Sequence, residues 1–465
     1  MTRLTAVAAA TVLLAGCASF SPDGGFDAVS GLTKERTGQP VAMQRTDHER
    51  QAAQDRVNEL LRQPLTAESA VEAALLNNRG LQARFGELGI AEADYVRAGR
   101  LPNPVFSFGR LSGGGEVEID RGVLFNILGL LTMPVASQVG QRRFQQAQYQ
   151  AASDAVSLAS EVRRAYFDAV AARELERYDQ QVKETADASN ELARRMLQAG
   201  NFSKLTQMRQ QAFYADATAQ LARARHQATA ARERLARLLG LSGEQLDLQL
   251  PERLPDLPGQ PAEPRDAERT AMDKRLDVLM ARRNAEATAR SLGLTRATRF
   301  VNVLEAGYQN KSQTGAPRAN GYEIELELPL FDFGSTRAAR AEATYMQAVN
   351  RTAEVAVNAR SEVRESYSAY RTAYDLARHY RDEIVPLRKR ISEENLLRYN
   401  GMLVDVFELL ADAREQVAGV TGYVQALRDF WVADSNLQTA LTGGSPGASS
   451  ISRPSSAAAA PAAGH

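Results

Sequence analysis

The sequence predicts a mainly α-helical protein with a small β part, built as two copies of a helix, a β-hairpin and a long helical hairpin. Three observations predict this class. Ala, Arg, Leu, Glu and Gln dominate the composition, while the 17 Pro and 32 Gly are sparse among 465 residues, which favours long helices. Matching motifs recur about 200 residues apart. Two pairs of short segments alternate apolar and polar residues around Gly-containing tips, as β-hairpins do.

The first residues have the layout of an export signal. Arg3 supplies the positive end, and residues 4–14 form a short apolar run that ends in small residues. The segment 14–17, Leu-Ala-Gly-Cys, resembles a bacterial lipobox, in which the cysteine is acylated. Because Cys17 is the only cysteine, we predict a signal peptide over 1–16 and lipidation of Cys17; cleavage without lipidation is the alternative. A single thiol also excludes a disulfide within the chain and a cysteine-based metal site.

The rest of the chain divides by composition. Residues 17–63 show little periodicity and are predicted to be a flexible, lipidated tether, and the Gly-, Ser-, Ala- and Pro-rich residues 443–465 a disordered tail. The first repeat is predicted over 64–250 and the second over 265–442, with a linker at 251–264.

An internal duplication relates the two repeats. Residues 79–83 match 274–278, and 133–135 match 328–330, both at an offset of 195. Gly140 matches Gly334 at an offset of 194, whereas the Ala-Gly-Asn at 199–201 matches Asn-Gly-Met at 400–402 at an offset of 201. The second copy has therefore gained one heptad, which keeps an apolar seam in register and indicates coiled-coil packing.

The elements follow in order. In the first copy, helices are predicted at 66–100, about 135–198 and 203–239, and strands at 105–111 and 117–125 around the Gly tip 113–115. In the second, helices are predicted at 265–296, 334–399 and 403–441, and strands at 300–308 and 322–328 around a tip with Asn310, Gly315 and Pro317. Gly200 and Gly401 are expected to end the long helices in left-handed conformations. A seam of mostly small residues with three-four spacing comprises Ala338, Ala341, Tyr345, Ala348, Thr352, Val355 and Ala359.

The last strand indicates a membrane role. Tyr322, Ile324 and Leu326 alternate with Glu323, Glu325 and Glu327, which gives one apolar and one acidic face. No segment after the signal has the ~18 consecutive apolar residues of a transmembrane helix, so we predict that strands make any crossing. Closed barrels need at least about eight strands, and the chain supplies four, so copies must share a barrel; two or three copies would do, and an open bore favours three. The alternative is that the hairpins are soluble structures of a periplasmic protein.

Three motifs carry a family resemblance. They are Leu-Pro-Asn-Pro at 101–104, Leu-Pro-Leu-Phe-Asp-Phe-Gly at 328–334, and the Tyr-Asn-Gly turn at 399–401 with its continuation to 405–406. With them the chain resembles the TolC-type outer-membrane efflux factors, the lipoprotein channels of tripartite efflux systems. The resemblance implies a homotrimer with a twelve-stranded β-barrel in the outer membrane and an α-barrel tunnel in the periplasm. It also implies docking to a periplasmic adaptor (membrane fusion) protein and an inner-membrane pump.

The resemblance also implies site residues. Adaptor contact is expected at the two turns, although a purely structural turn is the stronger interpretation of the glycines alone; the residues are Ala199, Gly200, Asn201, Asn400, Gly401 and Met402. A periplasmic gate is expected at Arg398, Tyr399, Asp405 and Glu408. The alternative for Asp405 and Glu408 is that they complement the positive end of a helix. Glu323, Glu325 and Glu327 are predicted to line the lumen if the apolar face contacts lipid.

The sequence contains no pattern that predicts catalysis, metal binding or nucleic-acid binding. The 56 Lys and Arg balance the 56 Asp and Glu, so no basic excess exists to bind nucleic acid. The four histidines are scattered without metal-site spacing, and no phosphate loop, nucleophile elbow or dinucleotide motif is present. We predict no enzyme activity, no cofactor and no metal site. The predicted function is a passive conduit for small molecules or metal ions; the alternatives are a structural periplasmic coiled-coil lipoprotein and an outer-membrane factor for protein secretion.

Overall fold

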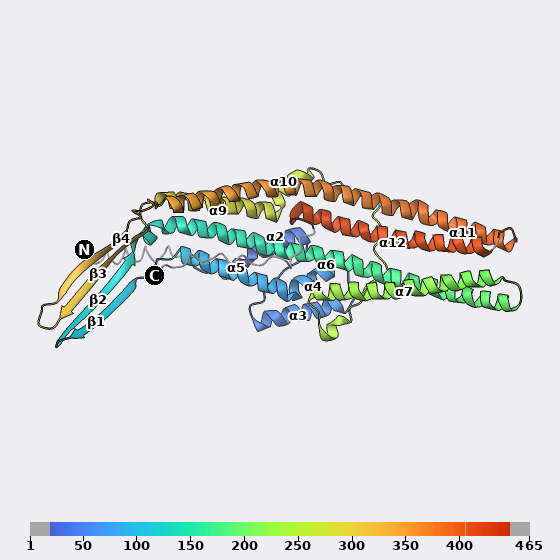
Figure 1. The fold of residues 1–465 in the computed structure, drawn as a ribbon, viewed down its shortest axis with the longest axis horizontal. Coiled ribbons are helices and arrows are strands. Elements are labelled where there is room, and N and C mark those ends of the chain that lie inside the picture. Colours follow the sequence, from blue (N-terminus) through green and yellow to red (C-terminus); the bar gives the residue numbers. More distant parts are fainter. Residues whose placement is uncertain (1–18, 405, 447–465) are drawn as a thin grey trace. The chain divides into compact units, whose positions relative to one another are not determined.

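The computed structural model describes residues 19–404 and 406–446. Within them both halves of the chain have the same order of elements: an interrupted helix, two strands, a long helix, a turn and a returning helix (Figure 1). The predicted duplication is therefore confirmed. The predicted signal peptide at 1–16, Cys17, Asp405 and all but the first residues of the predicted tail lie outside the described residues.

The first half differs from the prediction at two helix boundaries. The helix expected over 66–100 is interrupted at Asn78, whose side-chain amide donates to the carbonyl of Leu238 at 2.9 Å. The long helix begins at Ile127 rather than near 135, because the Asn126 side chain accepts the Gly129 N–H at 2.5 Å and caps it, with Pro134 inside the helix. The elements are α4 (Ala67–Asn77), α5 (Arg79–Ala98), β1 (Val105–Gly113), β2 (Glu116–Asn126), α6 (Ile127–Gln198) and α7 (Lys204–Leu239).

The second half also departs from the prediction in detail. The helix expected over 265–296 is interrupted at Arg275, and the helix expected over 334–399 contains one π-helical turn before Pro386. Asn310 lies in a strand opposite Asn320, not in the hairpin tip. The elements are α8 (Ala267–Lys274), α9 (Leu276–Ala297), β3 (Val303–Gln313), β4 (Ala319–Glu327), α10 (Ser335–His379), η2 (Tyr380–Ile384), α11 (Val385–Asn400) and α12 (Val406–Thr442).

The predicted N-terminal tether contains two helices, α2 (Phe26–Thr37) and α3 (Asp47–Leu61). Thr46 and Glu49 form a reciprocal capping box at the start of α3. Val29 of α2 and Val57 of α3 are fully buried. The expectation of an irregular, flexible segment over 17–63 is therefore wrong for residues 19–63, because both helices cover apolar side chains.

The four strands form one antiparallel sheet in the order β1-β2-β3-β4 (Figure 1). The hairpins of the two halves join through β2 and β3, where Gly122 is opposite Gln309. In the outer pairs, Phe108 is opposite Arg121 and Tyr308 is opposite Tyr322. In both hairpins the strands extend nearer to the tip than predicted, and β3 begins at Val303 rather than at 300.

The sheet belongs to a compact unit formed by residues 19–29, 84–151 and 276–358. Aromatic pairs hold the helical part of this unit: the rings of Tyr95 and Phe144 are stacked with centroids 5.8 Å apart. Near them the buried Glu92 carboxylate accepts the Ser21 N–H at 2.7 Å. The segment before α2, which contains Ser21, is thus bonded to α5.

A second compact unit comprises residues 30–83, 152–275 and 359–446. Its centre is an aromatic cluster in which Phe430 contacts Tyr370, Tyr374 and Trp431, with ring centroids 5.4, 5.8 and 5.1 Å apart. The predicted linker crosses this cluster, because the Trp431 indole donates to the Pro255 carbonyl at 3.0 Å. The linker is therefore part of the packed unit.

The interrupted helices cap the ends of the returning helices in this second unit. In the first half, the Asn77 side-chain amide donates to the carbonyls of Leu239 and Gly240 at 3.1 and 2.8 Å. In the second half, the Arg275 guanidinium, 1% exposed, donates to the Ala440 carbonyl at 3.4 Å and the Glu362 carboxylate at 2.7 Å. Both interruptions therefore satisfy carbonyls that a helix end leaves without partners.

The predicted seam of α10 is the less exposed side of that helix. Ala348 is 5% exposed and Ala359 is fully buried, and the other seam residues are half-buried. The three-four spacing therefore identified the packed face correctly.

Candidate functional site: a two-faced sheet and two helical turns

One face of the sheet is apolar and open. The register places alternate residues of the four strands on this face, most of them apolar: Phe106, Phe108, Ile119, Val123, Phe125, Leu304, Ala306, Tyr308, Tyr322, Ile324 and Leu326. Nearer to the hairpin tips the same face carries Arg110, Arg121, Asn310 and Asn320. Tyr322 is 87% exposed and Phe106 67% exposed. A face with so many exposed aromatic and aliphatic side chains requires an apolar cover.

The opposite face is acidic. Glu323, Glu325 and Glu327 share it, as their alternation with apolar residues predicted. The sequence analysis missed four further carboxylates on this face, Glu116, Glu118, Asp120 and Glu305. The alternation of the β2 carboxylates with Val117 and Ile119 was a usable signal for three of them.

Lys311 is the one basic side chain that the strands place on the acidic face. Its ammonium pairs with Glu118 and lies 4.0 Å from Asp120. The carboxylates of β4 contact neutral amides instead: Gln309 donates to Glu323, and Asn302 donates to Glu327 at 3.0 Å. The face as a whole keeps a large negative excess.

The junction from β4 to α10 needs a glycine. Gly334 has φ of 67°, and a Cβ there would lie 2.2 Å from the Arg299 carbonyl oxygen. Asp332 fixes this junction, since its carboxylate accepts the Gly334 N–H at 2.9 Å and the hydroxyl of Thr336 in the first turn of α10 at 2.5 Å. The aligned Gly140 of the first half lies inside α6 instead, so the two junctions differ in structure.

The first turn, between α6 and α7, has the predicted glycine cap. Gly200 has φ of 79°, and the Asn201 N–H donates to the Met196 carbonyl at 2.8 Å. The Ser203 hydroxyl accepts the Thr206 N–H at 3.1 Å and caps α7. This turn presents residues 199–201 at an exposed helix end.

The second turn, between α11 and α12, corrects the prediction for Gly401. Its φ is −81°, and Met402 adopts the left-handed conformation instead, with φ of 56°. The turn closes one residue later because the Leu403 N–H donates to the Arg398 carbonyl at 2.8 Å. Met402 is 94% exposed, so an apolar side chain stands outward at a strained position.

The predicted gate residues lie around this second turn. The Arg398 guanidinium pairs with Glu394 of its own helix at 3.1 Å. Tyr399 is 40% exposed, and Glu408 is an exposed residue in the first turn of α12. Asp405 lies outside the described residues. The structure thus brings Arg398, Tyr399 and Glu408 to one end of the hairpin.

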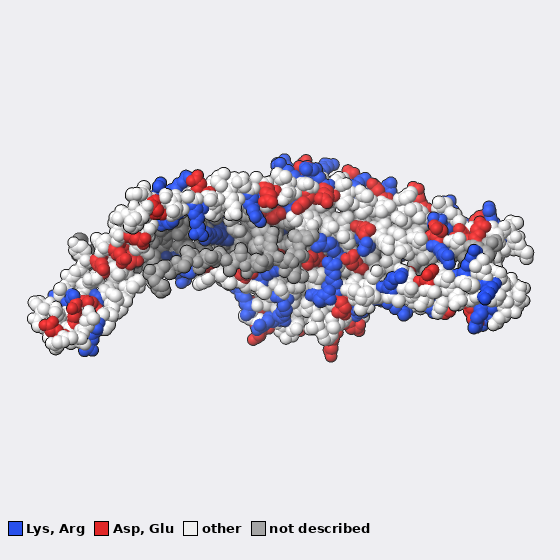
Figure 2. Space-filling view, in the orientation of Figure 1, with Lys and Arg blue, Asp and Glu red and all other residues white. Residues whose placement is uncertain are grey.

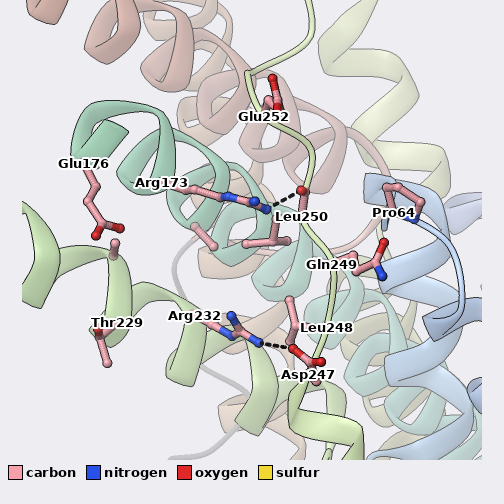
Figure 3. Close-up of a pocket in the computed structure, with 12 residues that line it drawn as sticks. Pro64, Arg173, Glu176, Thr229, Arg232, Asp247, Leu248, Gln249, Leu250 and Glu252 are labelled. Atoms are coloured by element: carbon pink, nitrogen blue, oxygen red, sulfur yellow. Dashed lines mark hydrogen bonds and ion pairs between the residues drawn. The ribbon is translucent and has the colours of Figure 1, made fainter. Parts of the chain in front are cut away.

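A cavity of about 520 Å³ lies beside α6, α7 and the chain after η1 (Gly243–Leu246) (Figure 3). The Arg173 guanidinium donates to the Leu250 carbonyl at 2.5 Å, and that of Arg232 to the Leu246 carbonyl at 2.7 Å. Both arginines therefore hold the chain between η1 and the linker, and we assign this cavity no ligand. Among residues 19–404 and 406–446, no three His, Cys, Asp or Glu side chains are grouped to hold a metal ion.

Charges of both signs are interspersed over the helices on the face seen in Figure 2. No helix in the described part of the chain has the length and apolar character of a membrane span.

Comparison with known proteins decides the family. A family model described as outer membrane efflux protein matches residues 135–241 and 269–391. The first match covers most of α6 and all of α7, and the second runs from α8 through β3, β4 and α10 into α11. The chain belongs to the outer membrane efflux protein family. A search of curated protein sequences gives no match.

Solved structures share the fold. The open-state MtrE outer membrane channel of Neisseria gonorrhoeae is 17% identical with a TM-score of 0.67, over 84% of this chain and 89% of that one. The Campylobacter jejuni CmeC outer membrane channel is 15% identical with a TM-score of 0.69, over 88% and 90%. The Vibrio cholerae outer membrane protein VceC is 16% identical with a TM-score of 0.67, over 85% and 98%. As an outer membrane efflux protein, the chain is a transport protein of the bacterial outer membrane.

Proposed function

We propose that this outer membrane efflux protein is the channel subunit of a tripartite system, a passive conduit for small molecules or metal ions. The two-faced sheet carries this proposal. Its apolar face suits lipid, and its acidic face suits a water-filled bore. The alternative, a structural coiled-coil lipoprotein, does not explain a sheet with one apolar and one acidic face.

Three copies form the working channel. In the four-stranded sheet, β1 and β4 each have one edge to which no strand of the described part of the chain pairs. Such edges must be paired in lipid, because no water is available to their N–H and carbonyl groups. Pairing β1 of one copy with β4 of the next closes twelve strands from three copies into a barrel wide enough to conduct.

The two turns serve docking and closure. The first turn at 199–201 and the second at 400–402 contact the periplasmic adaptor, which links the channel to an inner-membrane pump. Met402 supports this role, since an apolar side chain held outward by a strained backbone offers contact area. Arg398, Tyr399, Asp405 and Glu408 narrow the periplasmic end. Acylation of Cys17 anchors each copy to the outer membrane.

Deleting the gene tests the function. Cells without it should retain dyes, drugs or metal ions that the parent strain expels, and the intact gene should restore export. Variants with bulky residues at Asn201 or Met402 should form trimers but lose adaptor crosslinking and export, whereas Glu244→Gln, an exposed site in η1, should behave as wild type. Unchanged retention of every compound in the deletion strain would contradict the proposal.

A further inference from the structure

The helix that runs from α10 into α11 has one wide turn, η2. The Val385 N–H donates to the Tyr380 carbonyl, five residues back rather than four. Pro386 follows directly; in a regular α-helix it would lack an N–H to donate and its ring would collide with the carbonyl of Asp382. The wide turn accommodates the proline, and such turns are places where helices bend.

The neighbouring helix α12 has two glycines opposite this wide turn. A Cβ at Gly422 would lie 2.7 Å from Cε1 of the Tyr380 ring, and one at Gly419 would lie 3.5 Å from Cγ of Arg388. Both glycines therefore face η2 and the start of α11. Glycine is a weaker helix former than alanine, so each of them lowers the local stability of α12. The two helices of this hairpin thus share one bending point.

The helices are bonded to the linker at η2 itself and in the section above it. The Tyr374 hydroxyl donates to the Gly259 carbonyl at 2.9 Å, and the Arg381 guanidinium donates to that of Leu257 at 3.4 Å. On α12, the bond from the Trp431 indole to Pro255 does the same. The upper section is therefore tied to the packed aromatic cluster.

Below this point α11 and α12 hold each other. Arg388 pairs with Glu415 at 2.6 Å, and Asn395 donates to Asp412. A cavity of about 330 Å³ opens beside them, lined by residues of α6 and α7 and by Val417 of α12. The lower section is therefore a linked pair with free space on one side.

The duplication provides an internal comparison. At the offset of 201 that aligns the two turns, Thr185 stands where the second half has Pro386, and Thr218 and Leu221 stand where it has Gly419 and Gly422. Both α6 and α7 pass these positions as uninterrupted helices, and Leu221 is buried. The bending point is a feature of the second hairpin.

We propose that η2, Pro386, Gly419 and Gly422 form a hinge about which the lower α11–α12 section bends. The section that moves carries Arg398, Tyr399 and Glu408 at its end. The role of this hinge in opening and closing the periplasmic end rests on the proposed channel function, in which these residues form the gate. The geometry of the hinge itself is independent of that function.

Hydrogen–deuterium exchange of the purified full-length protein tests the hinge. Peptides covering 380–390 and 415–424 should exchange at least about tenfold faster than peptides covering 179–189 and 214–223, because opening there costs less. Pro386→Ala with Gly419→Ala restores one N–H and adds one Cβ without a clash, and should slow exchange about tenfold. Gly86→Ala with Gly89→Ala in α5, where added Cβ atoms meet open space, is the control and should leave these peptides unchanged.

Equal exchange in the two hairpins, or no slowing in the double variant, would overturn the hinge. If Pro386→Ala impairs folding, the exchange of Gly419→Ala alone is compared with that of wild type.

A second measurement, of conductance, distinguishes failure of the hinge from failure of the channel function. In a background with Asp405→Ala and Glu408→Ala, which should raise single-channel conductance, the hinge variant should remove at least half of the increase. Rapid exchange at the hinge in a protein that conducts no ions would overturn the channel function and leave the hinge standing.

Discussion

Glu305 of β3 and Glu325 of β4 are direct cross-strand partners on one face of the sheet. Like charges in this position destabilise an isolated pair of strands. Here they are flanked by Glu323 and Glu327 on the same face, with one ammonium, that of Lys311, contributed by the strands. An acidic face of this density is explained if it lines a bore through which cations pass.

The first prediction therefore concerns selectivity. Replacing Glu323, Glu325 and Glu327 together by Gln should lower the cation-over-anion permeability ratio at least about twofold, because charged rings set selectivity in pores. Reversal potentials in a salt gradient measure this ratio. The control replaces three exposed glutamates away from the sheet by Gln, Glu59, Glu68 and Glu244, with the same change in net charge. Equal selectivity in the two triple variants would show that the acidic face does not line the bore.

The second prediction concerns the buried arginine at the α8–α9 interruption. Arg275→Met should lower the free energy of unfolding by about 3 kcal/mol, because it leaves the Glu362 carboxylate and the end of α12 without a buried cation. The midpoint of denaturant unfolding, followed by circular dichroism in detergent, measures the loss. Arg97→Met is the control, since that side chain is 83% exposed and should change stability by less than about 0.5 kcal/mol. Matching midpoints for the two variants would refute the role of Arg275.

The third prediction concerns pH. Burial raises the pKa of the Asp434 carboxyl, although Arg163 opposes this. The folded state then holds this proton more tightly than the unfolded state does, so stability falls as pH rises from the unfolded pKa of about 3.9 through the folded value. Asp434→Asn should therefore unfold at a higher temperature than wild type at pH 7, and the difference should vanish below about pH 4. A lower unfolding temperature at pH 7 would show that the charged carboxylate is needed.

The fourth prediction concerns the anchor. Cys17→Ser should still be exported but should take up no labelled fatty acid, because the chain has no other cysteine. Metabolic labelling with palmitate, followed by membrane fractionation, measures both effects. Ser19→Ala, two residues further on, is the control and should keep the label. Retained label in the Cys17 variant would place the lipid elsewhere.

Much of the fold followed from sequence because its signals are periodic. Alternation over residues 322–328 placed Glu323, Glu325 and Glu327 on one face, since strand side chains alternate whatever the tertiary context. The matching motifs of the two halves located both helical hairpins, because corresponding residues of the two copies lie at the ends of the corresponding helices.

The corrections arise where tertiary contacts decide the backbone. Gly401 marks the second turn, but the left-handed residue is Met402, because a helix end can close one residue later on an available carbonyl. Helix α3 was missed because its few buried residues give a weak period, although the Thr46–Glu49 capping box signalled its start. Interruptions at Asn78 and Arg275 have no local signature, since their side chains serve helix ends far away in sequence.

Planar-bilayer recording of the purified full-length protein tests the central claim most directly. The proposed channel predicts discrete, cation-selective conductance steps from a species that migrates as a trimer on gels and as a monomer after heating. A protein that migrates as a monomer without heating, and adds no conductance above the bare bilayer, would contradict it.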